Sequence, residues 1–275
     1  MQTQKQKVLR AKKSLGQNFL TSRSAAQKLV SSCGVMESDT VVEVGPGKGM
    51  ITEILLAHAK KVIAVEKDET LVRFLKEKFA DEVASGKLLV VSGDILEFKP
   101  ASYKLQAKSY KLIGAIPYYI TGTFLRMFLT AQEQPETIGL IIQKEVADRI
   151  VARDKKENLL SLSVKAYGVP QYVEKVGRKN FRPAPNVDSA ILVVKNISRA
   201  FFDDVSESMF WSIVHAGFAH KRKRLMKNLS LQNSVTTETL ERVFASCRIP
   251  KDVRAENLPL DDWGCLAKAI TRTGV

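Results

Sequence analysis

The sequence predicts an α/β fold in which a parallel sheet with helices on both faces is followed by a smaller all-α domain. Through the first 150 or so residues, short β-branched runs alternate with helix-like stretches, which is the pattern of a parallel sheet. From about residue 203 only helical patterns remain. We therefore expect a first domain over residues 1–200 and a helical second domain over residues 201–275.

Five runs in the first part are compact and apolar, as strands buried on both faces should be. They are VVEV (41–44), VIAV (62–65), LLVV (88–91), LIGAI (112–116) and TIGLII (137–142). The stretches expected to form the helices of this part are 49–59, 69–80, 121–131 and 144–152.

After about residue 160 the pattern changes. Residues 171–176 and 189–195 could pair as antiparallel strands, and the two prolines between 180 and 186 predict an extended loop there. Helices are expected at 204–217, 221–230, 236–246 and 260–271. Ser206 and Thr236 are suitable N-caps, and Pro250 and Pro259 are helix breakers.

The composition narrows the class of protein. Hydrophobic residues make up 45% of the chain and charged residues 26%, which excludes a disordered or fibrous protein. Forty-three Lys and Arg against 29 Asp and Glu give a net charge of +14, which predicts nucleic acid or an anionic membrane as partner; a merely basic housekeeping enzyme is the alternative. No apolar stretch is long enough to span a bilayer, and we see no secretory signal. The three cysteines have neither a disulfide framework nor metal-ligand spacing, which fits a reducing cytosol.

The strongest local signal is VVEVGPGKGMITEILL at 41–56, a strand followed by Gly45, Gly47 and Gly49 and then a helix. Glycines permit a tight turn and a close approach of the backbone to a ligand. The spacing differs from the dinucleotide fingerprint, because the third glycine lies four positions after the first instead of five. The turn alone is weak evidence for a nucleoside site.

Acidic residues end the next two strands. Glu66 could accept hydrogen bonds from both hydroxyls of a ribose, and Asp94 could accept one from an adenine amine. Solvated acids at strand ends are common, but three features at three successive strand ends favour a ligand crevice at this edge of the sheet. The fourth strand runs into Pro117 and Tyr118, and Tyr118 could stack on a planar base or simply belong to the core.

Several long motifs in the same order make the chain similar to a known family. They are KKSLGQNFL (12–20), EVGPGKG, VEKD, GDIL, FRPAPNVDSA (181–190), FAHKRKRLMKNL (218–229) and WGCLAKAI (263–270). The chain resembles the bacterial small-subunit (16S) rRNA adenine dimethyltransferases of the kasugamycin-resistance type and, more distantly, the erythromycin-resistance rRNA methylases. The resemblance runs nearly end to end and implies a Rossmann-like class I methyltransferase sheet.

The resemblance implies S-adenosylmethionine as cofactor and two adjacent adenosines near the 3′ end of 16S rRNA as targets, each receiving two methyls. The residues expected at the cofactor are Asn18, Leu20, Gly45, Gly47, Gly49, Glu66, Lys67, Asp94, Ile95 and Ala115. Those expected at the target base are Ala115, Ile116, Pro117, Tyr118 and Phe181. The sulfonium charge activates the methyl, so no metal is expected.

One position departs from the family. Where the family has an asparagine whose amide oxygen accepts a proton of the target amine, this chain has Ala115. The carbonyl of Ile116 could remain as one acceptor. The substitution leaves open a slow enzyme, a binding protein that has lost catalysis, or an engineered change.

Clustered basic residues independently predict RNA binding. Five lie between residues 221 and 227 and five between 5 and 13, with no acid in either stretch. Those we assign to RNA are Lys12, Lys13, Lys221, Arg222, Lys223, Arg224 and Lys227. A solvated helix face is the plain alternative, and a membrane-surface helix is disfavoured by its small apolar face.

The expected protein is thus a cytoplasmic, monomeric methyltransferase that acts on the immature small ribosomal subunit. A catalytically impaired assembly factor of the same fold is the first alternative. A nicotinamide-dependent oxidoreductase is the second, and it rests only on the glycine turn and Glu66.

Overall fold

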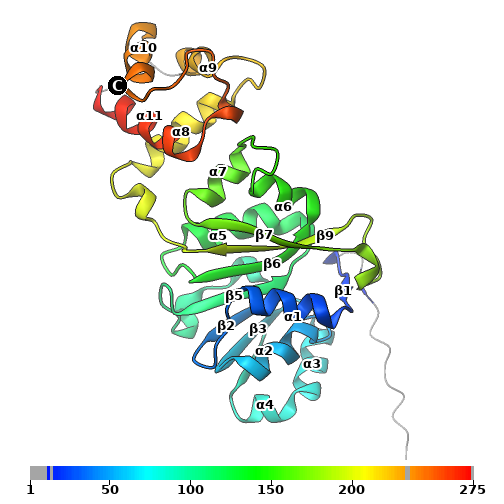
Figure 1. Ribbon diagram of the computed structural model, residues 1–275. Coiled ribbons are helices and arrows are strands. Elements are labelled where there is room, and N and C mark those ends of the chain that lie inside the picture. The colour runs from blue at the N-terminus through cyan, green and yellow to red at the C-terminus, as the bar shows by residue number, and fades with distance from the viewer. Residues whose placement is uncertain (1–10, 13–14, 233–235, 274–275) are drawn as a thin grey trace, which may run out of the picture. The chain divides into compact units, whose positions relative to one another are not determined.

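The structure, a computed structural model, describes residues 11–12, 15–232 and 236–273. The chain forms two compact units (Figure 1). The first consists of Met1–Ala147 and Gln171–Lys195, and the second of Asp148–Pro170 and Asn196–Val275. Residues 148–170 thus group with the helical unit, whereas the sequence analysis placed everything before residue 200 in the first domain.

A seven-stranded sheet forms the centre of the first unit, with the strand order β4-β3-β2-β5-β6-β9-β7. Strands β2 to β6 pair in parallel, as the alternating pattern predicted. Strand β9 runs antiparallel to β6, and β7 lies beside β9. The bounds are Thr40–Val44 (β2), Lys61–Glu66 (β3), Leu88–Ser92 (β4), Tyr110–Ala115 (β5), Thr137–Gln143 (β6), Val169–Val176 (β7) and Ser189–Lys195 (β9).

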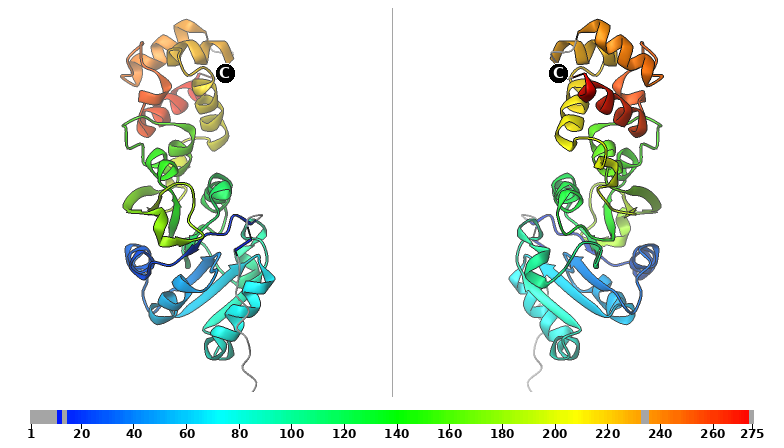
Figure 2. Two further views of the ribbon diagram at one scale, coloured as in Figure 1. Left: turned by 90° about the vertical axis from the view of Figure 1, so that its right-hand side faces the viewer. Right: turned by 90° about the vertical axis from the view of Figure 1, so that its left-hand side faces the viewer.

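Helices cover both faces of this sheet because the strands are apolar on both faces. Helices α1, α2 and α3 pack their buried residues against one face, and Figures 1 and 2 show α5 on the opposite side of the sheet from α1. The bounds are Arg23–Ser32 (α1), Met50–His58 (α2), Glu69–Lys78 (α3), Ala80–Ala84 (α4), Thr121–Thr130 (α5) and Lys144–Ile150 (α6). Helix α1 was not predicted, since its buried face is built from Ala25, Ala26, Leu29 and Val30 and gives only a weak periodic signal.

The sheet order locates the site. Strand β2 lies between β3 and β5 in the sheet. The chain continues from β2 toward β3 and β4 on one side, and from β5 toward β6 on the other, so the direction of the connections changes between β2 and β5. In open α/β sheets a crevice for ligands forms at such a point, outside the carboxyl ends of the strands. The turn after β2 is the glycine-rich segment singled out from the sequence.

The second unit is built from α7 (Leu159–Lys165), α8 (Glu207–Phe218), α9 (Leu225–Gln232), α10 (Thr237–Ser246) and α11 (Leu260–Arg272). Its core includes the fully buried Phe210, Phe244 and Trp263. The predicted caps are confirmed, because the side chains of Ser206 and Thr236 accept hydrogen bonds from the backbone of the first turns of α8 and α10.

Two expectations for this unit were wrong. Helix α9 begins at Leu225, so the basic residues 221–224 form a turn before the helix instead of its first turn. Cys247 and Cys265 form a disulfide, whereas the cysteine spacing showed no disulfide framework and fitted a reducing cytosol. The packing of α11 against the end of α10 brings the two sulfurs together, and their wide spacing in the sequence gave no sign of this. Cys33 is free and buried.

Candidate active site

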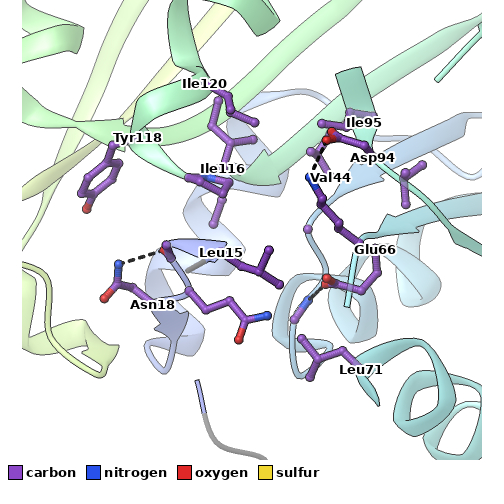
Figure 3. A pocket seen from close by; sticks show the side chains of 18 of the residues that line it. Leu15, Asn18, Val44, Glu66, Leu71, Asp94, Ile95, Ile116, Tyr118 and Ile120 are labelled. Carbon is purple, nitrogen blue, oxygen red and sulfur yellow. Dashed lines mark hydrogen bonds and ion pairs between the residues drawn. The ribbon is translucent and has the colours of Figure 1, made fainter. Parts of the chain in front are cut away.

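A cavity opens at the carboxyl ends of the parallel strands in the first unit (Figure 3). Its lining comes from the ends of the five parallel strands β2 to β6 and the segments that follow them, from the N-terminal segment, and from one residue of the segment before β9. The lining residues are Leu15, Gly16, Gln17, Asn18, Phe19, Val44, Gly45, Gly47, Val65, Glu66, Lys67, Leu71, Gly93, Asp94, Ile95, Leu96, Ala115, Ile116, Pro117, Tyr118, Tyr119, Ile120, Ile141 and Phe181.

The glycine turn after β2 forms one side of this cavity. Gly45 and Gly47 line it and have φ angles of 61° and 58°, a conformation that other residues rarely adopt. Gly49 has the same kind of backbone, at φ 79°, but does not line the cavity. A Cβ on Gly49 would lie 2.6 Å from the ring of Phe79, so this glycine is required by the packing of the turn against the end of α3.

Glu66 lies where the sequence placed it, at the end of β3 and against the cavity. Its carboxylate accepts hydrogen bonds from the backbone N–H groups of Gly47, at 3.2 Å, and Asp68, at 2.9 Å. Burial raises the pKa of Glu66, and these two hydrogen bonds oppose the shift. An ionised carboxylate has about four acceptor positions, so two remain available for a ligand.

Asp94 follows β4 and caps a short turn of 3₁₀ helix at Ile95–Glu97, because its Oδ1 accepts from the backbone of Leu96. Its Oδ2 lies 2.8 Å from the ammonium group of Lys67, and the hydrogen bond from Lys67 lowers the pKa of Asp94. Lys67 is therefore held by Asp94 beside the cavity. Ile95 adds an apolar surface next to the carboxylate, as Figure 3 shows.

The N-terminal segment forms a further wall. Asn18 lines the cavity, and its amide donates a hydrogen bond to the carbonyl of Gly16. Leu20 lies in β1 (Phe19–Leu20) and is buried in the core of the unit, so it does not line the cavity. The structure thus brings Asn18 to the predicted place and Leu20 to the packing behind it.

Sequence reasoning missed Gln17 and Asp68. The Lys12 ammonium lies 2.7 Å from one carboxylate oxygen of Asp68, and the amide of Gln17 donates to the other. Asp68 also caps α3, which an acid just before a helical stretch could have signalled. Lys12, assigned to RNA from the sequence, is thus ion-paired here, and Lys13 lies outside the described residues.

The end of β5 and the loop after it form the wall next to the glycine turn, since a Cβ on Gly45 would lie 3.6 Å from the carbonyl oxygen of Ala115. Ala115, Ile116 and Pro117 line the cavity, and Ile116 is buried. Tyr118 is partly buried, and its hydroxyl lies 2.6 Å from the hydroxyl of Ser189 on β9. Burial raises the pKa of Tyr118. The side chain at position 115 is a methyl group, so it brings no hydrogen-bond acceptor into the cavity.

Phe181 completes this side of the cavity. It lies in β8 (Phe181–Arg182), which pairs antiparallel with β1, and its ring is buried. Tyr119, which the sequence analysis did not assign, also lines the cavity and is 70% exposed. The cavity therefore has an acidic side at Glu66 and Asp94 and an aromatic side at Tyr118 and Phe181.

One buried acid lies outside the cavity, immediately before the glycine turn. Glu43 is fully buried in β2, and its polar neighbour is Thr52 of α2, whose hydroxyl is also buried. Burial raises the pKa of Glu43 to about 8; hydrogen bonding by Thr52 opposes the shift, and the nearby Glu66 adds to it. This carboxyl is therefore mostly protonated at neutral pH.

The predicted basic cluster lies in the second unit. Its five members are all exposed, and none forms an ion pair with a described residue: Lys221, Arg222, Lys223, Arg224 and Lys227. Asn228 positions the turn, since its amide donates to the carbonyls of Gly217 and His220. No helix in the described ranges is both long and apolar enough to cross a membrane.

Comparison with known proteins agrees with this arrangement. The profile of the family described as ribosomal RNA adenine dimethylase matches residues 8–272. A ribosomal RNA small subunit methyltransferase A from Dehalococcoides mccartyi is 40% identical over 96% of this chain and 90% of its own length. The protein of the same name from Streptococcus sanguinis is 35% identical over 96% of this chain and 93% of its own.

Two solved structures share the fold. A dimethyladenosine transferase from Plasmodium falciparum has a TM-score of 0.78 at 23% identity and covers 93% of this chain and 98% of its own. The 23S rRNA methyltransferase ErmE has a TM-score of 0.75 at 23% identity and covers 92% of this chain and all of its own. Both similarities extend over nearly the whole length of each chain.

Proposed function

The chain belongs to the ribosomal RNA adenine dimethylase family, and from this we propose which reaction its cavity performs. The protein transfers methyl groups from S-adenosylmethionine to the exocyclic amines of two adjacent adenosines near the 3′ end of 16S rRNA. It acts as a monomer in the cytoplasm, on immature small ribosomal subunits. The single observation that carries the proposal is the placement of Glu66 and Asp94 at neighbouring strand ends of one cavity, opposite an aromatic wall.

The residues present fit the donor. Glu66 keeps two acceptor positions free, as many as the two hydroxyls of a ribose require. Gly93 also lines the cavity, and a Cβ there would meet nothing within 4 Å, so the turn before Asp94 leaves space for a ring. Gly45 and Gly47 would lie along the methionine part, where the backbone must approach closely. Asn18, Lys67 and Ile95 would complete this part of the site.

S-adenosylmethionine supplies a methyl group that is already activated by the positive sulfur. The chain therefore has to position the acceptor and to adjust its electronic state. The amine of adenine is a poor nucleophile because its lone pair is delocalised into the ring. Acceptors aimed at its protons favour a pyramidal nitrogen, and holding the reacting groups in line contributes further rate.

The aromatic wall would receive the base. An adenosine inside RNA must leave its stack before it can reach the cavity. Stacking on a side chain such as Tyr118 is worth about 1–3 kcal/mol per base, which offsets part of this cost. Phe181 would contact the other face of the ring. The Tyr118–Ser189 hydrogen bond fixes the ring that the base would meet.

Ala115 leaves this site with one hydrogen-bond acceptor fewer for the target amine than the family pattern has. Without the amide oxygen that the family carries there, the backbone carbonyls of the loop are the acceptors left for the amine. Loss of one preorganised polar partner in other enzymes costs on the order of 100- to 1000-fold in rate. We therefore expect slow methyl transfer by the chain as it stands and a large gain from Ala115→Asn.

The test is incorporation of labelled methyl groups into unmethylated small ribosomal subunits, comparing this chain with Ala115→Asn. We expect N6-dimethyladenosine in digested rRNA from both reactions, with the variant faster by about 100-fold or more. No incorporation by either protein would refute the proposal.

The second candidate function, a binding factor that has lost catalysis, rests on Ala115 alone. It predicts tight binding to unmethylated small subunits and no measurable turnover by the chain as it stands. Substantial dimethylation by that chain would exclude it.

A further inference from the structure

A short basic loop contains Phe181, which is its one residue among those lining the cavity. Residues 177–187 contain three cations and no acid: Arg178, Lys179 and Arg182. All three are exposed, and none forms an ion pair with a described residue. The nearest acids along the chain are Glu174 and Asp188. The carboxylate of Asp188 accepts the backbone N–H of Arg178 and pairs with Lys175 at 2.7 Å, and the charge of Arg178 helps to lower the pKa of Asp188. Lys179 and Arg182 form no ion pair with a described residue, and Arg178 has only this longer-range interaction, so the net charge of the loop is available to a partner.

The loop is held rigidly against the N-terminal segment. Its first turn is a 3₁₀ helix at Arg178–Asn180, followed directly by β8. The carbonyl of Asn180 accepts hydrogen bonds from both the backbone and the hydroxyl of Thr21, and β8 pairs with β1. Figure 1 shows this yellow-green segment between β7 and β9 lying alongside β1. Cations fixed in this way lose little backbone freedom when they bind.

The two residues of β8 differ in which way their side chains face. Phe181 is buried and lines the cavity, whereas its neighbour Arg182 is exposed. Successive side chains of a strand point to opposite faces. Arg178 and Lys179 precede Phe181 in the adjoining turn. One short segment therefore presents an aromatic ring to the cavity and, on its other side, positive charge to the solvent.

We propose that Arg178, Lys179 and Arg182 form a phosphate-binding rim that holds the RNA backbone on either side of the adenosine in the cavity. The inference rests on the proposed function, because it takes RNA as the occupant. A nucleotide that has left its stack remains joined to the strand, so its flanking phosphates must lie at the mouth of the pocket that receives the base. Contacts to phosphates position a protein on nucleic acid without reading sequence.

Nearby cations on the same side are already occupied. The ammonium groups of Lys12 and Lys67 pair with Asp68 and Asp94, and Lys48 lies over the ring of Phe19 at 5.0 Å. The rim cations therefore offer the free charge closest to Phe181 along the chain. The rim cations are distinct from the basic turn at residues 221–224, which lies in the other unit.

The test uses the triple variant R178Q/K179Q/R182Q and the matched control K60Q/K61Q/K108Q. The control removes the same charge from exposed lysines at the amino ends of β3 and β5, the opposite edge of the sheet from the cavity. A third protein, R178K/R182K, keeps the charge. Thermal unfolding and calorimetric binding of S-adenosylhomocysteine should be alike in all of them, because the changed side chains are exposed and none has an ionic partner.

The decisive readout is the salt dependence of binding to unmethylated small ribosomal subunits. Each phosphate contact contributes roughly 0.7–0.9 to the slope of log affinity against log salt. We expect the triple variant to lose about two units of slope or more, and the control and R178K/R182K to lose less than one. In methyl transfer, KM for the particle should rise in the triple variant while kcat at saturation stays close to that of the unaltered chain.

Equal slopes for the triple variant and the control would overturn the rim proposal and leave the proposed function intact. Salt-dependent binding that the rim variant weakens, without methylation even by Ala115→Asn, would support the rim and refute the methyl-transfer function. No binding by the unaltered chain at any salt concentration would overturn both.

Discussion

The cavity of the sheet unit and the basic turn of the helical unit use charge in opposite ways. At the cavity, Glu66 is buried at a strand end and fixed by two backbone hydrogen bonds. At the turn, residues 221–224 are exposed and have no described ionic partner. A buried charge must be placed by the surrounding fold, whereas an exposed cluster acts through its number of charges. Substitutions should therefore affect binding and stability together at the first region and binding alone at the second.

The largest effect is expected from removing the acid at the cavity. Glu66→Ala takes away the acceptors assigned to the ribose and the partners of two backbone N–H groups. Hydrogen bonds to charged groups contribute about 1.5–3 kcal/mol each, so affinity for S-adenosylhomocysteine should fall on the order of 100-fold or more. Isothermal titration calorimetry measures this, with Glu69→Ala, an exposed acid of the next helix, as control. Unchanged affinity in Glu66→Ala would show that the buried acid of the cavity does not hold the cofactor, and the contrast with the exposed basic turn would not stand.

The next effect concerns pH and the buried Glu43. Since burial raises its pKa from 4.5 to about 8, the folded state holds a proton that the unfolded state releases. Stability from this group is complete below pH 4.5 and is lost as pH rises to about 8. Glu43→Gln stays neutral, so it should be more stable relative to the unaltered chain at pH 7 than at pH 4, by roughly 3 kcal/mol. Urea unfolding at the two pH values measures the difference.

Glu53→Gln is the matched control for that experiment. Glu53 is exposed, and its hydrogen bond with Arg23 lowers its pKa. Its substitution should therefore show no gain as pH rises. A Glu43→Gln effect that was the same at both pH values would show that Glu43 is ionised in the folded protein.

A smaller loss of stability is expected from alanine at two glycines, and comparing them separates the cost of packing from the cost of backbone strain. Gly49 and Gly86 both have positive φ, at 79° and 76°, but only a Cβ on Gly49 meets a neighbour within 4 Å. Alanine at either site costs about 1–2 kcal/mol of strain, and overpacking at Gly49 adds about 1–3 kcal/mol. Gly49→Ala should thus unfold at lower urea concentration than Gly86→Ala. Equal losses would mean that Phe79 moves aside freely.

The smallest change in stability is expected at the basic turn. K221Q/R222Q/K223Q/R224Q should leave the free energy of unfolding within about 0.5 kcal/mol, because exposed side chains away from structural contacts contribute little. The slope of log affinity against log salt for small ribosomal subunits should nevertheless fall by roughly three units. A destabilised variant with an unchanged slope would assign these residues a structural role.

The parts of the fold that follow from short-range patterns could be predicted. Strands β2 to β6 carry compact apolar runs, and the caps of α8 and α10 are read from Ser206 and Thr236. The pairing of β9 with β6 depends on contacts between distant segments, as does the disulfide between Cys247 and Cys265. Helix α9 begins late because residues 221–224 form a turn that Asn228 holds from within the helix.

The site was predictable in the same measure. Glu66 and Asp94 lie at the cavity because strand ends of a parallel sheet share one edge. The sequence of the turn does not reveal which of its glycines faces a ligand. Gly49 was therefore expected at the cofactor together with Gly45, although it packs against Phe79. Gln17 reaches Asp68 from 51 residues away, a contact that no local pattern announces. The roles of these residues toward cofactor and RNA remain predictions.

The pairing of β1 with β8 joins two walls of the cavity that come from distant parts of the sequence, since Phe19 faces Arg182 and Leu20 faces Phe181. The strand on one side continues from Asn18, beside the space assigned to the donor, and the strand on the other carries the ring assigned to the target. Neither wall can swing outward alone without breaking the ladder and the Thr21–Asn180 bonds. A substitution that disrupts this ladder should therefore disturb both walls of the cavity at once.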